Sequence, residues 1–291
     1  MANDQSRVAA TQRGASSAAM PTTDGPYTVA LIGAGSIARV IVRELLEHHP
    51  QVRLAGVLVH DPVRARECGI ASAARLTSSL PELLSWRPTL IAECAGHAGL
   101  SQYGAPVLEH GTNLVVASVG ALADRDLERS LRAAAASGGA HMRIPSGAVG
   151  GLDALASARL SGLTSVRYSG RKPVAAWRGS RAEDAVDLDR IETATPFFHG
   201  SAREAALAYP QNANVAAAVA LSGVGFDATR VTLIADPAAH GNQHLIEAEG
   251  AFGRFNFSVV GTALPGNPKT SSLAAYSLLH CLVSPADTTQ I

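Results

Sequence analysis

Residues 29–46 read VALIGAGSIARVIVRELL, and this stretch decides the fold. The apolar run before Gly33 is typical of a buried strand, and the residues after Gly35 have the apolar spacing of an amphipathic helix. Gly33 permits a tight turn, Gly35 lets the backbone approach a pyrophosphate, and Ala38 is small enough for close helix–strand packing. The stretch therefore predicts a nicotinamide dinucleotide site. The alternative is an ordinary glycine turn in an α/β protein.

The same turn places the N–H groups of Ser36 and Ile37 at a helix N-terminus, where the helix dipole favours a phosphate. The second predicted strand should end beside the adenosine ribose. An acidic residue directly at the strand end would favour NAD, but Asp61 comes late, and the alternative is a plain turn residue. Arg64 and Arg66 come next and could reach the 2′-phosphate of NADP. We therefore expect NAD or NADP as the cofactor.

The composition excludes several classes of partner. The 291 residues are 47% hydrophobic and 16% charged, with a formal net charge of zero, so we expect no nucleic acid partner. No apolar run approaches the roughly 18 residues of a membrane span. Cys68, Cys94 and Cys281 are widely spaced, which argues against a disulfide framework and favours a reducing, cytoplasmic location. We expect no metal site.

The chain divides into a tail and two domains. Residues 1–24 are small and polar, and we interpret them as a flexible tail, with a transit peptide as the alternative. Residues 25–146 alternate strand-like and helical stretches, which predicts a parallel sheet with helices on both faces. Residues 147–270 suggest an α+β substrate domain. Helix 271–283 is expected to pack back on the first domain.

Several β-prone runs support this division. In the first domain they are Thr28–Ile32, Leu54–Val59, Thr89–Glu93 and Asn113–Ala117. In the second domain the last three runs are close together and joined by short turns, so they predict an antiparallel sheet. These runs are Thr229–Ala235, Gln243–Glu249 and Gly253–Val260.

Small residues follow the third and fourth strands of the first domain. The carboxyl ends of parallel strands line the ligand crevice, so we expect Ala95, Gly96 and Ser118 beside the cofactor. Cys94 could be a nucleophile, but a cysteine at the end of an apolar strand is more often part of the core. His97 is either a crevice residue or a solvated loop histidine.

Two polar segments interrupt the apolar second domain, YPQNAN at 209–214 and ADPAAHGNQH at 235–244. Such turns are often only caps of helices and strands. Asn242 and His244, however, share one strand face and can point into one cleft. An imidazole with a pKa near about 6.5 suits general acid–base catalysis. His240 lies in the loop, where we expect it to be solvated.

Seven short stretches together resemble the L-aspartate dehydrogenase family, over residues 29–277. They are GAGSI at 33–37, SVGAL at 118–122, IPSGA at 144–148, RKP at 171–173, YPQNANV at 209–215, ADP to NQH at 235–244 and NPKTS at 267–271. The resemblance implies an α/β fold, with a Rossmann-type doubly wound parallel sheet and a second α+β domain. It implies NAD(P)-dependent oxidation of L-aspartate to iminosuccinate, which water hydrolyses to oxaloacetate and ammonia, or the reverse reductive amination.

The resemblance also assigns roles. His244 matches the family's acid–base histidine, and Ala148 and Asn214 match its cofactor contacts. The substrate carboxylates need cationic or N–H partners, for which we favour Lys172 because Pro173 fixes the chain beside it. The other candidates are Arg171, Lys269 and the N-termini of the helices after Gly147 and Ser271.

The resemblance leaves alternatives open. A homoserine- or semialdehyde-type dehydrogenase could use the same fold with Cys94 or a lysine pair. A non-catalytic dinucleotide sensor would bind the cofactor without turnover. We expect small-molecule substrates, a role in amino-acid metabolism and NAD biosynthesis, and a homodimer or higher homo-oligomer. The chain departs from the family at its ends, in the N-terminal tail and soon after Pro285.

Overall fold

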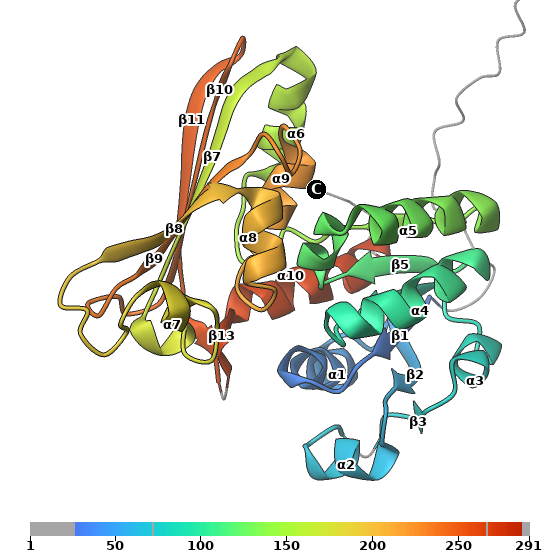
Figure 1. The fold of residues 1–291 in the computed structure, drawn as a ribbon. Helices are drawn as coiled ribbons and strands as arrows, with labels where there is room; N and C mark the ends of the chain where they lie inside the picture. The colour runs from blue at the N-terminus through green and yellow to red at the C-terminus, as the bar shows by residue number, and fades with distance from the viewer. Residues whose placement is uncertain (1–26, 72, 266, 287–291) are drawn as a thin grey trace, which may run out of the picture.

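The computed structural model describes residues 27–71, 73–265 and 267–286, so the predicted tail, 1–24, lies outside the described residues. Two sheets, each with its own helices, stand side by side (Figure 1). The first is six-stranded and parallel, in the order β3-β2-β1-β4-β5-β6. Its strands are β1 Thr28–Ile32, β2 Arg53–Leu58, β3 Leu76–Thr77, β4 Leu90–Glu93, β5 Asn113–Val116 and β6 Met142–Arg143.

This sheet confirms the predicted doubly wound parallel fold. The strand order reverses between β1 and β4, which creates the crevice that binds ligands in such sheets. Prediction missed β3 and β6, because two residues are too few to show a hydrophobic period.

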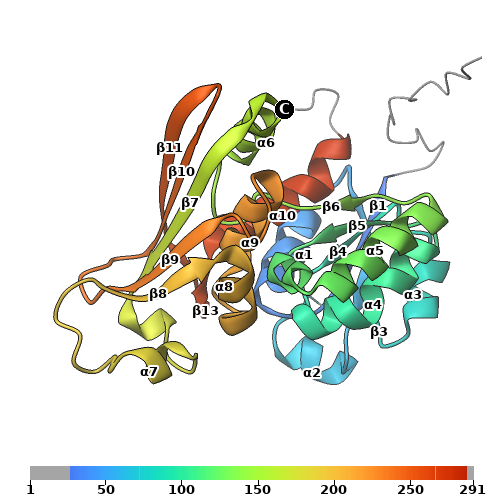
Figure 2. The same ribbon diagram turned by 45° about the horizontal axis from the view of Figure 1, so that its top comes forward.

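Helices cover both faces of the first sheet (Figure 2). Val29 and Leu31 pack toward α1 and α10, whereas Ala30 and Ile32 face α3, α4 and α5. A strand buried on both faces needs apolar residues at every position, which explains the continuous run in β1. The helices are α1 Ser36–His48, α2 Pro62–Glu67, α3 Leu80–Ser85, α4 His97–Glu109, the 3₁₀ turn η1 Val119–Ala123 and α5 Arg125–Gly138.

The last helix, α10 (Ser272–Val283), packs on α1 and β4, where Leu278 and Leu282 are fully buried. The short strands β12 (Ala263–Leu264) and β13 (Asn267–Ser271) lead into it, and η3 (Ser284–Ala286) follows. Within the described part of the chain, no helix combines the length and apolar character needed to cross a membrane.

The second sheet is mixed, with the order β11-β10-β7-β9-β8. The predicted antiparallel pairing of the three late runs is correct for β10 and β11 and wrong for β9, which pairs in parallel with β7 and antiparallel with β8. The much earlier β7 inserts between β9 and β10, and short turns carry no signal for that non-local pairing. The strands are β7 Leu163–Lys172, β8 Thr195–Ser201, β9 Arg230–Ala235, β10 Asn242–Gly250 and β11 Gly253–Gly261.

Among the described residues, helices cover the face of the second sheet that looks toward the first sheet (Figure 1). Along β7, Val166, Tyr168, Gly170 and Lys172 are buried and alternate with more exposed residues, as a half-buried strand requires. The elements here are α6 Leu152–Ser161, η2 Val174–Ala176, α7 Ala182–Ala185, α8 Ala202–Ala208 and α9 Asn214–Ser222.

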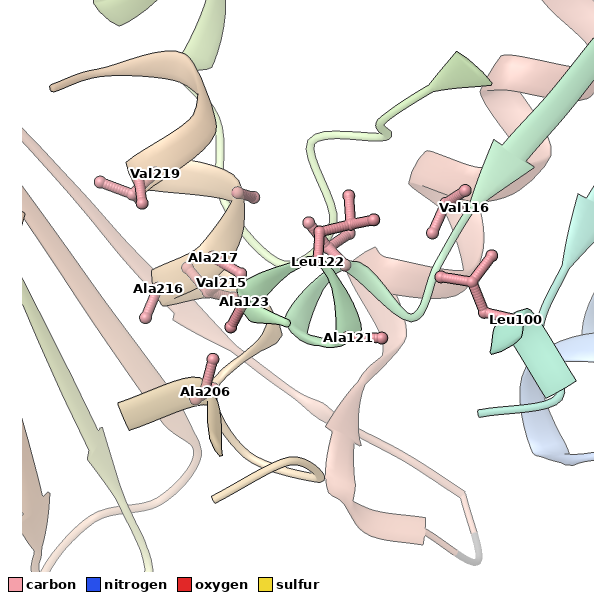
Figure 3. Packing of buried hydrophobic residues seen from close by; sticks show 14 of the residues in the cluster. Leu100, Val116, Ala121, Leu122, Ala123, Ala206, Val215, Ala216, Ala217 and Val219 are labelled. Atoms are coloured by element: carbon pink, nitrogen blue, oxygen red, sulfur yellow. The ribbon is translucent and has the colours of Figure 1, made fainter. Parts of the chain in front are cut away.

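The two halves share one apolar core, with η1 between them (Figure 3). Leu122 and its neighbours in η1 contact α4 and α5 on one side and α8 and α9 on the other. Residues of this cluster are Leu100, Val116, Ala121, Leu122, Ala123, Ala206, Val215, Ala216, Ala217 and Val219. Close packing of small side chains therefore fixes α9 against the first sheet.

Gly33 joins the turn after β1 to the neighbouring strands. Its N–H donates to the carbonyl of Leu58 at 2.8 Å, its φ is 108°, and a Cβ there would lie 2.8 Å from the carbonyl oxygen of Cys94. Gly139, which ends α5, has a φ of 64° and open space around it. Substitutions at these two glycines therefore separate the cost of backbone strain from the cost of steric overlap.

We expect Gly33→Ala to lower the free energy of unfolding by roughly 3 kcal/mol, because strain and overlap combine. Gly139→Ala should cost about 1–2 kcal/mol from the left-handed backbone alone. Urea denaturation of both variants measures the difference. Equal losses would show that the close approach at Gly33 is relaxed at little cost.

Candidate functional site

A cavity lies between the carboxyl edge of the first sheet and the inner face of the second. Ile37, Ala117 and Val119 line it from the first sheet's side. The connection to the second sheet contributes residues 145–148. The residues from the second half are Lys172, Gln211, Asn212, Asn214, Val215, Ala218, Asn242 and His244, and those from the α10 end are Thr270, Ser271 and Ala274.

A second cleft opens at the carboxyl ends of β1, β2 and β4. Gly33, Gly35, Asp61, Arg64 and Ala95 are among the residues that line it. A Cβ on Gly35 would meet only the Cys94 carbonyl oxygen, at 4.0 Å, so the backbone beside it is open to a ligand. The two clefts lie on either side of the start of α1. This arrangement fits a dinucleotide whose pyrophosphate sits at the helix N-terminus.

The ribose end differs from the sequence-based expectation. The Asp61 carboxylate caps α2 by accepting hydrogen bonds from the N–H groups of Val63 (2.9 Å) and Arg64 (3.0 Å). Arg64 lines the cleft, but Arg66 does not, because its guanidinium donates to the carbonyls of Ala71 and Ala74. Residues two apart on a helix point in different directions, so the prediction that both arginines reach a 2′-phosphate is wrong for Arg66.

The structure divides the predicted cofactor residues into three groups. Ile37, Ala148 and Asn214 line the cavity between the sheets, and Gly33, Gly35 and Ala95 line the second cleft. The remaining three, which line neither, are Ser36, Gly96 and Ser118. The Ser36 hydroxyl accepts a hydrogen bond from Asn267, and that of Ser118 donates to Glu93.

Glu93, at the end of β4, is a fully buried residue that sequence reasoning missed. Its Oε1 accepts from the N–H groups of Ala95 (2.7 Å) and Gly96 (3.0 Å) and from the Ser118 hydroxyl (2.9 Å), and its Oε2 accepts from the Ser118 N–H (3.1 Å). Burial raises the pKa of Glu93, and these hydrogen bonds oppose the rise. The sequence does carry a signal for Glu93, which is a glutamate at the end of an apolar, strand-like run.

Asn214 connects the second half to the first. Its Oδ1 accepts a hydrogen bond from the Gly120 N–H at 2.9 Å. A Cβ on Gly120 would lie 2.8 Å from that oxygen and 3.1 Å from His97 Nε2, so glycine permits the close approach. Burial lowers the pKa of His97, which is half-buried beside this contact.

Lys172, at the end of β7, is a cation buried in the cavity wall, with 4% of its surface exposed. Its Nζ donates to Asn212 Oδ1 at 3.1 Å and lies 5.3 Å from the centre of the Trp177 ring. Arg171 points to the other face of the strand and pairs with Asp236 at 2.8 Å, so it is not available as an alternative to Lys172 in the cavity. The side chain of Lys269 lies outside the described residues.

His244, on the inner face of β10, is 3% exposed. Its Nδ1 is hydrogen-bonded to Tyr168 Oη at 2.8 Å, and its Nε2 has no partner among the described residues. Burial and the nearby charge of Lys172 lower the pKa of His244 to about 3, so the imidazole is neutral at neutral pH. Asn242 lies on the same face, as predicted, and His240 is exposed in the loop.

Cys94 is not an activated nucleophile. Its Sγ donates to the carbonyl of Ile32 at 3.3 Å, and burial raises the pKa of the thiol. A reactive cysteine needs the opposite shift, because the thiolate is the nucleophile. The semialdehyde-type alternative therefore has no support at this residue.

Known proteins match the chain over nearly all of the described residues. Residues 153–284 match the family described as aspartate dehydrogenase, C-terminal, and residues 33–145 match the homoserine dehydrogenase NAD binding domain. An L-aspartate dehydrogenase from Pseudomonas aeruginosa is 46% identical over 258 residues, covering 87% of this chain and 96% of that protein. One from Ruegeria pomeroyi is 48% identical over 257 residues, covering 87% and 90%.

Solved structures also resemble this chain. The crystal structure of aspartate dehydrogenase from Thermotoga maritima superposes with a TM-score of 0.71 at 25% identity, covering 91% of this chain and 99% of that one. A homoserine dehydrogenase from Thiobacillus denitrificans shares the fold, with a TM-score of 0.59 at 14% identity and coverage of 90% and 73%.

We expect Glu93→Gln to lower the free energy of unfolding by about 1–3 kcal/mol and to weaken NADH binding. The side-chain amide of glutamine has an NH₂ group in place of one carboxylate oxygen, and this group must face a donor of Ala95, Gly96 or Ser118. Ser118→Ala removes a single donor and should cost about 1 kcal/mol. Urea denaturation and fluorescence titration with NADH measure both effects. Unchanged stability and affinity in Glu93→Gln would contradict the role given to this carboxylate.

Proposed function

The chain belongs to the L-aspartate dehydrogenase family, and from this premise we propose that the cavity between its two sheets is where L-aspartate is oxidised to iminosuccinate. Hydrolysis of iminosuccinate then gives oxaloacetate and ammonia. The reverse reaction is the reductive amination of oxaloacetate. One observation carries the proposal: His244 and Lys172 line the same cavity as the predicted cofactor residues Ile37, Ala148 and Asn214.

We assign the cofactor to the first domain, residues 25–146, and the substrate to the second, residues 147–270. The N–H groups at the start of α1 would hold the pyrophosphate beside Gly35, and Ala148 and Asn214 would contact the nicotinamide end. When bound, NAD or NADP accepts the hydride from the substrate α-carbon. Arg64 lines the second cleft, which supports the use of NADP.

The two substrate carboxylates need separate partners. Lys172 Nζ supplies a buried cation for one of them. The N-terminus of α10 supplies N–H groups for the other, and Ser271 supports this assignment. Its hydroxyl is buried in the cavity wall and has no hydrogen-bond partner among the described residues. A substrate with one carboxylate would engage only one of these two groups, at a cost in binding free energy.

His244 suits the role of general base and acid. Its neutral Nε2 can take a proton from the substrate ammonium, which frees the nitrogen lone pair as the α-carbon is oxidised. After it has released that proton to solvent, the same nitrogen can take a proton from the water that attacks the imine. Two substrate carboxylates would offset the charge of Lys172, which raises the pKa of His244 toward the range where proton transfer is efficient.

We propose a cytoplasmic enzyme that acts as a homodimer or higher homo-oligomer. The face of the second sheet that looks away from the first sheet supports association, because Val260 there is 70% exposed and Leu245 and Ile234 are half-buried. Sedimentation equilibrium measures the assembly state.

Reduction of NAD and NADP by the wild-type protein tests the proposed function. We expect L-aspartate to give turnover with a kcat/KM at least about 100-fold above those of L-alanine and L-homoserine, because the site pairs two carboxylates. Absorbance at the nicotinamide band gives the rates. Cofactor binding without turnover of any amino acid would instead support the sensor alternative.

His244→Ala should lower kcat for L-aspartate by about 10²–10⁴-fold, because it removes the group that moves protons. The dissociation constant for NADPH should change little, since the pyrophosphate and ribose lie elsewhere. Steady-state kinetics and fluorescence titration measure the two effects, with exposed His240→Ala as the matched control. An equal loss of cofactor affinity would contradict the assignment.

A further inference from the structure

We propose that Tyr168 is the positioning residue of His244, and that the missing side chain at Gly170 gives the tyrosine hydroxyl the space to reach the imidazole. The contact determines which ring nitrogen of His244 faces the substrate. The kinetic consequences rest on the proposed function, whereas the protonation pattern of the ring exists without substrate or cofactor.

The register of the second sheet sets up the contact. In the antiparallel pair of β7 and β10, His244 lies opposite Gly170, and Ile246 lies opposite Tyr168. Tyr168 and His244 are therefore diagonal neighbours on the inner face, within reach of an aromatic side chain. The two rings are nearly parallel, with an interplanar angle of 18° and centres 6.0 Å apart.

Glycine is required at position 170 because a Cβ has no room there, and not because of the backbone conformation. Gly170 does not have a positive φ, so other residues could adopt its backbone conformation. A Cβ there, however, would lie 2.7 Å from Tyr168 Oη and 3.2 Å from Cζ of the same ring. Alanine at this position would push the hydroxyl away from His244 while leaving both partners in the sequence.

The hydrogen bond at Nδ1 selects the state of Nε2. When His244 is protonated, both ring nitrogens are donors, so Tyr168 Oη must accept from Nδ1–H. The same arrangement in the neutral ring leaves a lone pair on Nε2, which is buried in the cavity wall without a partner among the described residues. One geometry thus serves both before and after proton transfer, and the ring does not turn between them.

The charges around His244 favour a neutral partner at Nδ1. The titratable groups that face it are Tyr168 and Lys172 of β7, and the described residues lining the cavity include no carboxylate. Val259 of β11, which lies opposite His244, carries no charge, and neither do Asn214 of α9 and Ser271 at the α10 end, which line the same cavity. Burial raises the pKa of Tyr168, so the hydroxyl stays protonated and neutral. A neutral acceptor stabilises the imidazolium less than a carboxylate would, which lets His244 release the proton again.

The test combines ¹⁵N NMR of the His244 imidazole with kinetics of Tyr168→Phe, Gly170→Ala and the double variant. In the wild type we expect the proton of the neutral ring on Nδ1. In both single variants we expect a mixture of the two protonation patterns. We also expect kcat for L-aspartate to fall about 10- to 100-fold, as for other hydrogen-bond partners that orient a functional histidine. The acid limb of the kcat profile should move to lower pH.

Controls separate positioning from general damage. KM and the NADPH dissociation constant should stay within about twofold of the wild type, and Ser169→Ala, on the opposite face of β7, should leave all readouts unchanged. Gly170→Ala should add little in the Tyr168→Phe background, because both changes break one contact.

Three results would overturn the inference. They are a wild-type ring protonated on Nε2, an unchanged kcat and pH profile in Tyr168→Phe, or fully additive losses in the double variant. If the wild type does not oxidise L-aspartate, the proposed function fails, and the NMR spectra alone decide whether Tyr168 fixes the ring.

Discussion

The buried carboxylate of Glu93 is the interaction on which the rest of the site depends. It binds both turns that leave the central strands, through the N–H groups after β4 and both donors of Ser118. Ser118 begins η1, and η1 in turn donates from Gly120 to Asn214 at the start of α9. Hydrogen bonds, together with the short backbone segment from Ser118 to Gly120, thus connect the core of the first sheet to the second half. The apolar cluster around Leu122 packs η1 against α8 and α9 along this path.

Side chains alternate between the two faces along each strand of the second sheet, and this alternation places the chemical groups in the cavity. Lys172 ends the inner face of β7, and Asn242 and His244 begin the inner face of β10, so one cavity receives a cation, an amide and an imidazole. Burial keeps the imidazole neutral, which a base requires. Lys172 is a buried cation in the cavity wall, so a carboxylate ligand suits the charge of the site.

Local signals were sufficient for the parallel sheet, its dinucleotide turn, and the strand face with Asn242 and His244, because each depends on residues close in sequence. They failed where partners are distant. The insertion of β7 beside β9 had no local signature, and neither did the contacts of Glu93 and Tyr168, which join strands far apart in the chain. Arg66 was misplaced because its direction depends on where a short helix begins.

A crystal structure with NAD and succinate, an unreactive dicarboxylate, tests the central claim most directly. The account predicts succinate in the cavity between the sheets, with one carboxylate about 3 Å from Lys172 Nζ and His244 Nε2 facing its methylene carbons. It predicts the other carboxylate at the N-terminus of α10, beside Ser271. Succinate bound elsewhere, or a His244 ring turned away from the nicotinamide side of the cavity, would contradict the account.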